Sequence, residues 1–157
     1  MIRLRKMTEE EFLRFKEYST ADYAKDLMSR ESLDVDQAFA MAVKDFSEAL
    51  PDGLETQGQF LMTIEEVQNH MTVGCLWFHY EEQQVFLDDF LIHEAERRKG
   101  YATAALLEME RMAKADGCTE SVLFVWDHDP EAAALYRRCG YDAVSRIDGG
   151  SYMRKEL

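Results

Sequence analysis

The feature that most constrains the fold is an apolar run, a glycine-containing loop and an amphipathic helix, followed by a second apolar run. The first run covers residues 85–92, and the periodic helix covers 102–114. The loop between them contains Arg97-Arg98-Lys99-Gly100-Tyr101-Ala102. Residues 122–126 are apolar throughout, which is typical of a strand buried on both faces. Strand, helix and strand in this order predict a βαβ unit.

The loop before this helix has the chemistry of an anion site. A helix begins with backbone N–H groups that have no acceptor within the helix, and its dipole adds partial positive charge at that end. Three adjacent cations, Arg97, Arg98 and Lys99, add full charge in a chain that is otherwise acidic. We therefore expect the loop to bind phosphate. The simpler alternative is an ordinary basic helix start.

The rest of the chain alternates between helices and strands. Thr8 and Glu11 form a capping box that begins a helix, and a second helix is predicted for 34–50, before Pro51-Asp52-Gly53. The other predicted elements are a helix at 130–138 and strands at 2–6, 60–64, 73–78, 141–147 and 151–155. The predicted fold is α/β (α+β): a mixed, mostly antiparallel twisted sheet of about seven strands with helices on both faces.

Size and composition limit the function. A chain of 157 residues corresponds to one ordinary domain, so we predict a single domain over 1–157. Lys and Arg number 18 and Asp and Glu 31, and the net charge of −13 disfavours nucleic acid and anionic lipid and favours cations, including amines. No apolar run approaches the roughly 20 residues that span a bilayer. The 3 cysteines and 4 histidines show no disulfide framework and no metal motif, so we predict a cytoplasmic protein with no metal site and no membrane partner.

A second segment follows the strand at 122–126. Asp129 is placed to cap a short helix, with Pro130 at its first position and Gly140 after its end. Each of these features is common by itself. Their combination with the loop is more specific, because one helix and one buried strand separate the two segments.

Together the two segments resemble the GNAT superfamily of N-acyltransferases, which use acyl-CoA. Arg97-x-x-Gly100-x-Ala102 matches the (Q/R)xxGx(G/A) signature of that superfamily. Ala132-x-x-Leu135-Tyr136-x-x-x-Gly140-Tyr141 resembles its second motif, NxxAxxLYxxxGF. More narrowly, residues 50–56 and the Leu76-Trp77-Phe78-His79 strand are similar to the Bacillus YycN-like branch.

The resemblance implies an acetyl-CoA site. The strand at 85–92 would splay from the strand at 122–126, and the pantetheine arm would lie in the opening. The backbone groups that pair with this arm would come from Phe90, Leu91, Ile92 and His93. The N–H of Ile92 would hold the thioester oxygen as it becomes an oxyanion. The diphosphate would lie on a set of residues that comprises Arg97, Arg98, Lys99, Gly100, Tyr101, Ala102 and Thr103.

Four residues are candidates for proton transfer. Tyr136 matches the family's tyrosine near the sulfur of CoA, which can protonate the departing thiolate; its alternative is a core position. Asp88, Asp89 and Glu94 lie on or just after the splayed strand, and each could take the amine proton directly or through water. Asp88 and Asp89 can face one substrate only if a bulge intervenes, because successive strand residues face opposite ways. The alternative for all three is a solvated strand edge.

The implied activity is N-acetyl transfer from acetyl-CoA to a primary amine by direct attack. The acceptor, a polyamine, an aminoglycoside-like compound or a protein amine, would lie by the two N-terminal helices and residues 51–59. Aromatic side chains there could line a pocket, and Glu55 could anchor a cation. Some relatives that acetylate protein N-termini carry a glutamate where this chain has Phe124, which argues against their mechanism here.

One departure from the family pattern keeps other functions open. Asp129 stands where the family usually has an asparagine that contacts the cofactor, and Asp lacks the amide donor. An acyl-CoA-binding regulatory module without turnover is therefore the alternative. A phosphate-binding domain of unrelated chemistry is a further one, although no GxGxxG of the Rossmann type follows the first strand. The acceptor, the base and the oligomeric state stay open, and the resemblance allows a homodimer.

Overall fold

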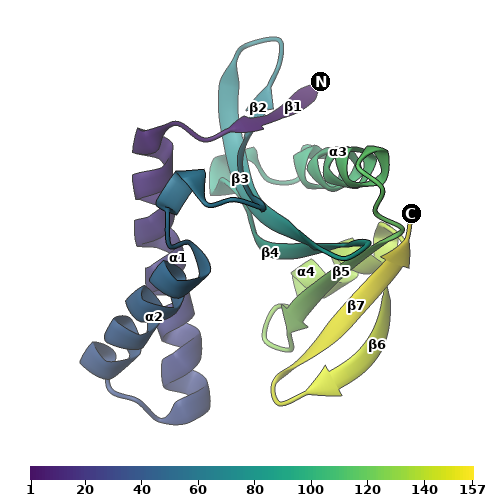
Figure 1. The fold of residues 1–157 in the computed structure, drawn as a ribbon. Coiled ribbons are helices and arrows are strands. Elements are labelled where there is room, and N and C mark those ends of the chain that lie inside the picture. The colour runs from purple at the N-terminus through teal and green to yellow at the C-terminus, as the bar shows by residue number, and fades with distance from the viewer. The chain divides into compact units, whose positions relative to one another are not determined.

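One seven-stranded sheet, in the order β1-β2-β3-β4-β5-β7-β6, organises the computed structural model, which describes residues 1–157 (Figure 1). The strands are β1 (Ile2–Lys6), β2 (Gln59–Glu66), β3 (Met71–Glu81), β4 (Gln84–Ile92), β5 (Glu120–Trp126), β6 (Asp142–Ile147) and β7 (Gly150–Glu156). The helices are α1 (Glu9–Glu31), α2 (Val35–Ala49), α3 (Tyr101–Ala115) and α4 (Pro130–Arg138), with short 3₁₀ turns η1 (Gly53–Glu55) and η2 (Glu94–Glu96). The predicted mixed sheet with helices is confirmed.

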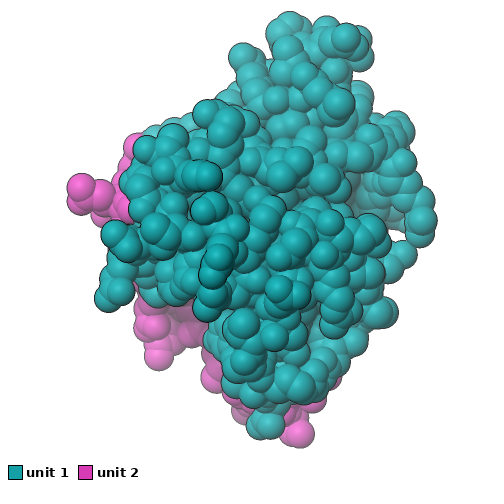
Figure 2. Space-filling model, turned by 90° about the vertical axis from the view of Figure 1, so that its right-hand side faces the viewer, with its two compact units in different colours: residues 1–6, 62–157 teal, residues 7–61 magenta.

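The chain forms two compact units, which Figure 2 colours separately. The first comprises residues 1–6 and 62–157, and the second comprises residues 7–61. The single domain predicted over 1–157 stays a prediction. No helix combines the length and apolar character that crossing a bilayer requires.

The unit of residues 7–61 contains α1, α2 and η1. The predicted capping box is present, since the N–H of Glu11 donates to Oγ1 of Thr8 and the N–H of Thr8 donates to the Glu11 carboxylate. A second capping box, which we did not predict, joins Asp34 and Gln37 at the start of α2. The two helices pack through small and aliphatic side chains, which are Ala24, Leu27, Ala38 and Ala42.

The larger unit contains the βαβ unit predicted from sequence. β4 and β5 are parallel, and α3 connects them, whereas β4 pairs antiparallel with β3 and β5 antiparallel with β7. α3 contacts β4, and α4 contacts β5. α3 begins at Tyr101, one residue before the predicted start, because Gly100 serves as its N-cap in a left-handed conformation with φ 85°.

A buried polar network holds α3 and the end of α4 on the same face of the sheet. The hydroxyl of Tyr141 lies 2.7 Å from Oγ of Ser121 on β5 and donates to the Glu110 carboxylate on α3 at 3.0 Å. The ring of Tyr141 packs edge-on against Tyr136 of α4, with centroids 6.0 Å apart. On this face the side chains of β4 and β5 are buried, among them Val85, Leu87 and Leu123. The network thus fixes α4, which carries Tyr136, to the same core as α3.

Candidate functional site

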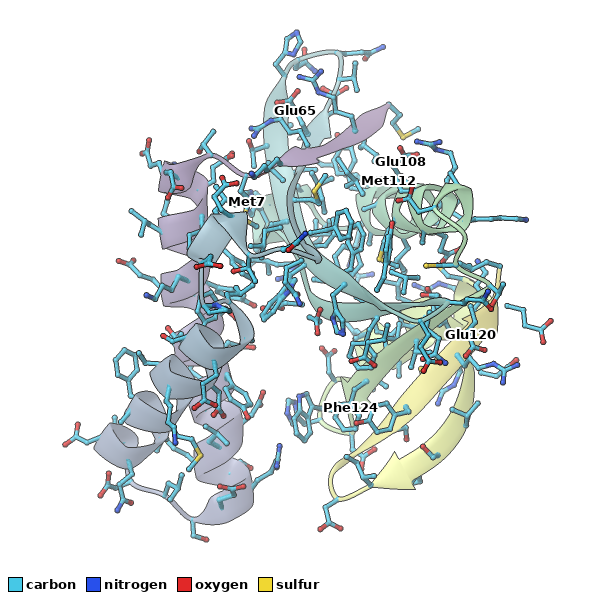
Figure 3. All side chains as sticks on the ribbon, viewed as in Figure 1. Met7, Glu65, Glu108, Met112, Glu120 and Phe124 are labelled. Atoms are coloured by element: carbon cyan, nitrogen blue, oxygen red, sulfur yellow. The ribbon has the colours of Figure 1, made fainter.

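The parallel ladder between β4 and β5 stops partway along both strands. Its last pair is Leu87 with Leu123, although β4 continues to Ile92 and β5 to Trp126. Beyond that pair β4 stays bonded to β3, and β5 stays bonded to β7. Glu120 and Phe124, which Figure 3 labels, mark the paired and the diverging parts of β5. The sheet therefore opens where the resemblance places the pantetheine arm.

The register of β3 and β4 shows which backbone groups face this opening. In an antiparallel pair, residues that exchange hydrogen bonds alternate with residues whose backbone groups point away from the partner strand. The N–H of His93 donates to the carbonyl of Val73 at 2.8 Å, so that pair is bonded. Ile92 and Phe90 are consequently in the outward-facing positions. Of the four predicted partners of pantetheine, these two direct their backbone groups to the opening.

The outward groups differ in their partners. The Phe90 N–H donates to the Asp89 carboxylate at 2.9 Å, and the Ile92 carbonyl accepts from Nε of Arg97 at 3.0 Å. This leaves the Phe90 carbonyl and the Ile92 N–H available to a ligand. An acceptor and a donor in this arrangement can pair with an extended amide chain in the way a neighbouring strand would.

A glycine on β3 lets the two strands approach closely behind Ile92. A Cβ on Gly74 would lie 2.1 Å from the Leu91 carbonyl oxygen and 3.0 Å from the Ile92 Cα. Both are backbone atoms, so β4 would have to shift to admit a side chain. Only glycine is compatible with this position of the Ile92 N–H.

A bulge interrupts β4 at its two aspartates. Leu87 pairs with Phe78 and Asp89 with Trp77, so Asp88 has no partner of its own on β3. The bulge anticipated from the Asp-Asp pair is therefore present. Asp89 shares the face of its opposite residue, Trp77, and Asp88 bonds to a side chain on that same face. The bulge thus places both carboxylates on one side of the sheet.

That side chain is His79 of β3. Its Nδ1 lies 2.6 Å from Oδ2 of Asp88, and its Nε2 lies 3.3 Å from Oε1 of Glu81. The bond to Asp88 raises the pKa of His79, against the lowering effect of burial. Burial raises the pKa of Asp88, whose side chain is 18% exposed, and His79 opposes this rise. Asp88 is thus a partly desolvated carboxylate bonded to the His79 imidazole, which carries a positive charge when it is protonated.

Tyr136 lies on α4 with its ring buried. The hydroxyl makes no hydrogen bond within the protein. Every fully buried side-chain oxygen in the structure does make one, so the Tyr136 hydroxyl is not fully buried and reaches accessible space. Burial raises the pKa of Tyr136, and the charges of Asp129 and Asp89 raise it further. Asp129 caps α4 by accepting from the N–H of Ala132 at 3.1 Å. Tyr136, Asp129 and Asp89 therefore share one electrostatic environment.

The loop from Arg97 to Thr103 presents backbone donors. The N–H groups of residues 98–103 have no acceptor in the protein, and Ala104 makes the first bond of α3, to the Gly100 carbonyl at 3.1 Å. Arg98 and Gly100 have positive φ values of 63° and 85°. Successive N–H groups in such a turn can converge on an anion. No atom lies within 4 Å of the position that a Cβ on Gly100 would take, so the space beside the turn is open.

The three cations of this loop have protein partners. Arg97 is tied to the Ile92 carbonyl, Arg98 pairs with Glu131 at 3.2 Å, and Lys99 pairs with Glu96 at 3.0 Å. The Arg97 contact joins the loop to the open end of β4. Residues 98–103, whose N–H groups have no protein acceptor, are thus connected to the open end of β4 through Arg97.

The remaining predicted residues are placed as follows. Leu91 stands opposite Cys75 in a bonded position of the β3 ladder, and Tyr101 and Ala102 are half-buried in the first turn of α3. Glu94 is exposed in η2, beyond the end of β4, and the structure shows it in no contact with the other candidate carboxylates. No group of three or more His, Cys, Asp or Glu side chains could hold a metal ion.

The sequence analysis missed His79 and Gly74. A signal for His79 was present: Glu82 and Gln83 form a two-residue hairpin, which pairs Glu81 with Gln84 and so His79 with Phe86. Gly74 gave no such signal, because a close approach between strands cannot be recognised from one strand.

Comparison with known proteins decides the family. Residues 12–141 match the acetyltransferase (GNAT) family. The chain belongs to the GNAT family. It is 32% identical over 150 residues to the uncharacterized N-acetyltransferase YycN of Bacillus subtilis, covering 93% of this chain and 96% of YycN. The crystal structure of YycN superposes with a TM-score of 0.85 at 30% identity, covering 94% of this chain and 96% of that one. The predicted resemblance to the YycN-like branch is confirmed.

Two more distant structures share the fold of this GNAT protein. The PaiA N-acetyltransferase of Thermoplasma acidophilum, in complex with coenzyme A, has a TM-score of 0.76 at 15% identity and covers 100% of this chain and 99% of its own. Spermidine N-acetyltransferase of Vibrio cholerae, in complex with CoA and spermine, has a TM-score of 0.68 at 16% identity, with coverage of 99% and 95%. At these identities the likeness establishes the fold alone.

Proposed function

We propose that this GNAT protein transfers an acetyl group from acetyl-CoA to a primary amine by direct attack. The observation that carries the proposal is the end of the β4·β5 ladder at Leu87 and Leu123. It leaves a donor and an acceptor on β4 beside a loop of N–H groups that have no protein acceptor. Bound acetyl-CoA supplies an acyl group activated on a thiol leaving group, and the residues of the chain do the rest.

The chain's backbone binds and orients this substrate. The N–H groups of residues 98–103 receive the diphosphate, and the Phe90 carbonyl pairs with an amide of the pantetheine arm. The Ile92 N–H donates to the thioester oxygen as negative charge develops there. A donor of this kind can lower the barrier by about 2.7–4 kcal/mol.

Side chains move the protons. Asp88 accepts the proton of the attacking amine, because a desolvated carboxylate with a raised pKa is a stronger base than an exposed one. A carbon–nitrogen bond forms, the carbon–sulfur bond breaks, and the hydroxyl of Tyr136 donates to the departing thiolate. Asp89, whose charge acts on Tyr136, is the second candidate for the base that accepts the amine proton, and Glu94 is the third.

One observation favours the alternative function. The charges of Asp129 and Asp89 raise the pKa of Tyr136, which makes its hydroxyl a reluctant acid although it stays a hydrogen-bond donor. A protein that binds acyl-CoA and regulates a partner without turnover would tolerate such a residue. The two functions differ in one measurable respect, the release of thiol.

The test combines binding with turnover. We expect CoA to bind more tightly than pantetheine, which lacks the diphosphate, and thiol to be released from acetyl-CoA when primary amines are added. Tight CoA binding without thiol release for any amine would favour the regulatory module. If ATP displaced acetyl-CoA at equal concentration, the site would be a general phosphate site and the proposal would fail.

A further inference from the structure

Aromatic side chains form a continuous row on the face of the sheet that carries Asp88 and Asp89. The row comprises His79 of β3, Phe86 of β4, Tyr152 of β7, Phe124 and Trp126 of β5, and His128 after β5. Successive ring centroids in that order lie 5.4, 6.4, 5.1, 4.8 and 6.0 Å apart. All six residues belong to the unit of residues 1–6 and 62–157. We call this feature the aromatic row.

The row differs from the core on the opposite face. The alternate residues of β5, such as Leu123 and Val125, are buried, whereas Phe124 and Trp126 are only half-buried. Fully buried packing therefore does not account for these rings. A large half-buried aromatic surface on one face of a sheet is typical of a site that binds another molecule.

Two glycines leave room for rings of the row beside the strand backbones. A Cβ on Gly150 would lie 2.2 Å from Cζ of Phe124, so the Phe124 ring occupies the space above Gly150. A Cβ on Gly149 would lie 3.5 Å from Trp126. The Asp148-Gly149-Gly150 turn therefore also sets the height of the rings, and the row is a defined surface rather than a scatter of side chains.

Charge is distributed unevenly along the row. At its β4 end, His79 holds Asp88, and Asp89 follows on the same face. The carboxylate of Asp127, which is paired with Arg146 through two hydrogen bonds of 3.0 and 2.7 Å, belongs to the opposite face, since Arg146 also donates to Ser151, the residue opposite Val125. The two carboxylates Asp88 and Asp89 therefore lie at the end of the row beside the opening between β4 and β5.

We infer that the aromatic row binds the stem of the acceptor, and that the acceptor is a primary amine with an aromatic stem. This inference rests on the proposed function. The ammonium lies at Asp88 and Asp89, next to the thioester, and the stem extends over Phe124 and Trp126. Aromatic rings favour offset or edge-to-face contact with another ring, which gives such a stem its preference.

The rings select the acceptor by its stem. The aliphatic stem of a polyamine has no ring and cannot make offset or edge-to-face ring contacts with Phe124 and Trp126. The acceptor class inferred here therefore differs from spermine, which is bound in the Vibrio structure.

The experiment compares amines on the wild-type protein. Thiol release from acetyl-CoA is measured with phenethylamine, n-butylamine and spermidine. We expect kcat/KM for phenethylamine to exceed that for either of the others by about 10-fold or more, the scale on which an apolar pocket separates related stems. A higher value for spermidine would overturn the inference and leave the proposed function intact. Thiol release with no amine would overturn both.

Variants in the row separate recognition from folding. In Trp126→Leu we expect kcat/KM to fall about 10-fold more for phenethylamine than for n-butylamine. A structural defect would reduce kcat/KM for both amines alike, and that result would contradict a specific role of Trp126 in binding the aromatic stem. Phe124→Tyr, which keeps the ring, should retain the phenethylamine preference, and its loss would contradict the inference too. If Trp126→Leu does not fold, the wild-type comparison still decides.

Discussion

The two halves of β4 have the same strand geometry but different surroundings. From Gln84 to Leu87 the strand is bonded on both sides, to β3 and β5, and Val85 and Leu87 are buried. From Asp88 to Ile92 it is bonded to β3 alone, after a bulge. The first half holds the sheet together, and the second exposes backbone donors and acceptors to a ligand. A single extra residue, Asp88, marks the change between them.

This comparison shows how the fold creates a binding edge inside a sheet. An exposed strand edge attracts other strands and is usually shortened or covered. Here the edge lies within the sheet, between β4 and β5, so a narrow linear ligand reaches it more easily than another protein does. The Arg97 contact to the Ile92 carbonyl closes the edge at one end. The edge is therefore both available and limited in length.

The largest effect should come from the closed half. Leu123 is 1% exposed at the last β4·β5 pair, so Leu123→Ala leaves a cavity in the core. We expect a loss of about 2–5 kcal/mol in the free energy of unfolding, measured by urea denaturation. The affinity of the folded protein for CoA should not change. A folded Leu123→Ala protein that no longer bound CoA would show that the two halves cannot be separated.

A variant in the open half should reduce the rate instead. Ile92→Pro removes an N–H that faces away from β3, so the ladder to β3 keeps its bonds. We expect kcat to fall by roughly 10²–10³-fold, the effect of losing one oxyanion donor. Ile92→Ala is the matched control, because it loses the side chain and keeps the N–H. Leu91→Pro removes a bonded N–H and should unfold the strand. Equal kcat in Ile92→Pro and Ile92→Ala would exclude the donor role.

How far the sequence predicts these halves depends on the range of the interactions. The loop at Arg97–Ala102 and the first capping box follow from neighbouring residues, and the sequence predicts them, whereas the bulge at Asp88-Asp89 was named only as a condition for the two carboxylates to face one substrate. The opening between β4 and β5 was expected only from the resemblance to the GNAT family, because strand divergence has no local signal. The contact of His79 with Asp88 depends on strand register, which the Glu82-Gln83 hairpin indicates, whereas the close approach at Gly74 appears only in the structure.

The next effect concerns the hydroxyl that reaches the accessible space beside the open half. Tyr136→Phe keeps the ring packed on Tyr141 and removes the donor. We expect kcat to fall by about 10²-fold, the lower end for a proton donor, with CoA affinity nearly unchanged. Unchanged kcat would discard the role of Tyr136.

The neighbouring tyrosine is the control for that variant. Tyr141→Phe makes the same chemical change in a buried network and removes one hydrogen bond from Ser121 and one from Glu110, which keeps its ion pair with Lys155. We expect it to cost about 1–3 kcal/mol of stability and little activity in the folded protein. If Tyr141→Phe lowered kcat and Tyr136→Phe lowered stability instead, the division between core and site would be contradicted.

The smallest effect concerns the histidine that holds the bulged residue. Because Asp88 raises the pKa of His79 above its ordinary value of about 6.5, the charged imidazole stabilises the folded state. The contribution is fully present below that ordinary value and is lost as the pH rises through the raised pKa. In His79→Gln, which keeps a neutral donor, we expect a loss of about 1 kcal/mol at a pH between the pKa of Asp88 and that of His79, and this loss disappears as the pH rises above the pKa of His79.

Two measurements sharpen this prediction. NMR titration should show the pKa of His79 falling in Asp88→Asn, because burial then acts against a single partner, Glu81. Glu81→Gln should lower it less, since Glu81 lies 3.3 Å from Nε2 and its side chain is 67% exposed. If the difference in free energy of unfolding between the wild type and His79→Gln grew with rising pH, the neutral imidazole would be the form that stabilises the bulge. Asp88 would then be held by a hydrogen bond without a charge, and its raised pKa would follow from burial alone.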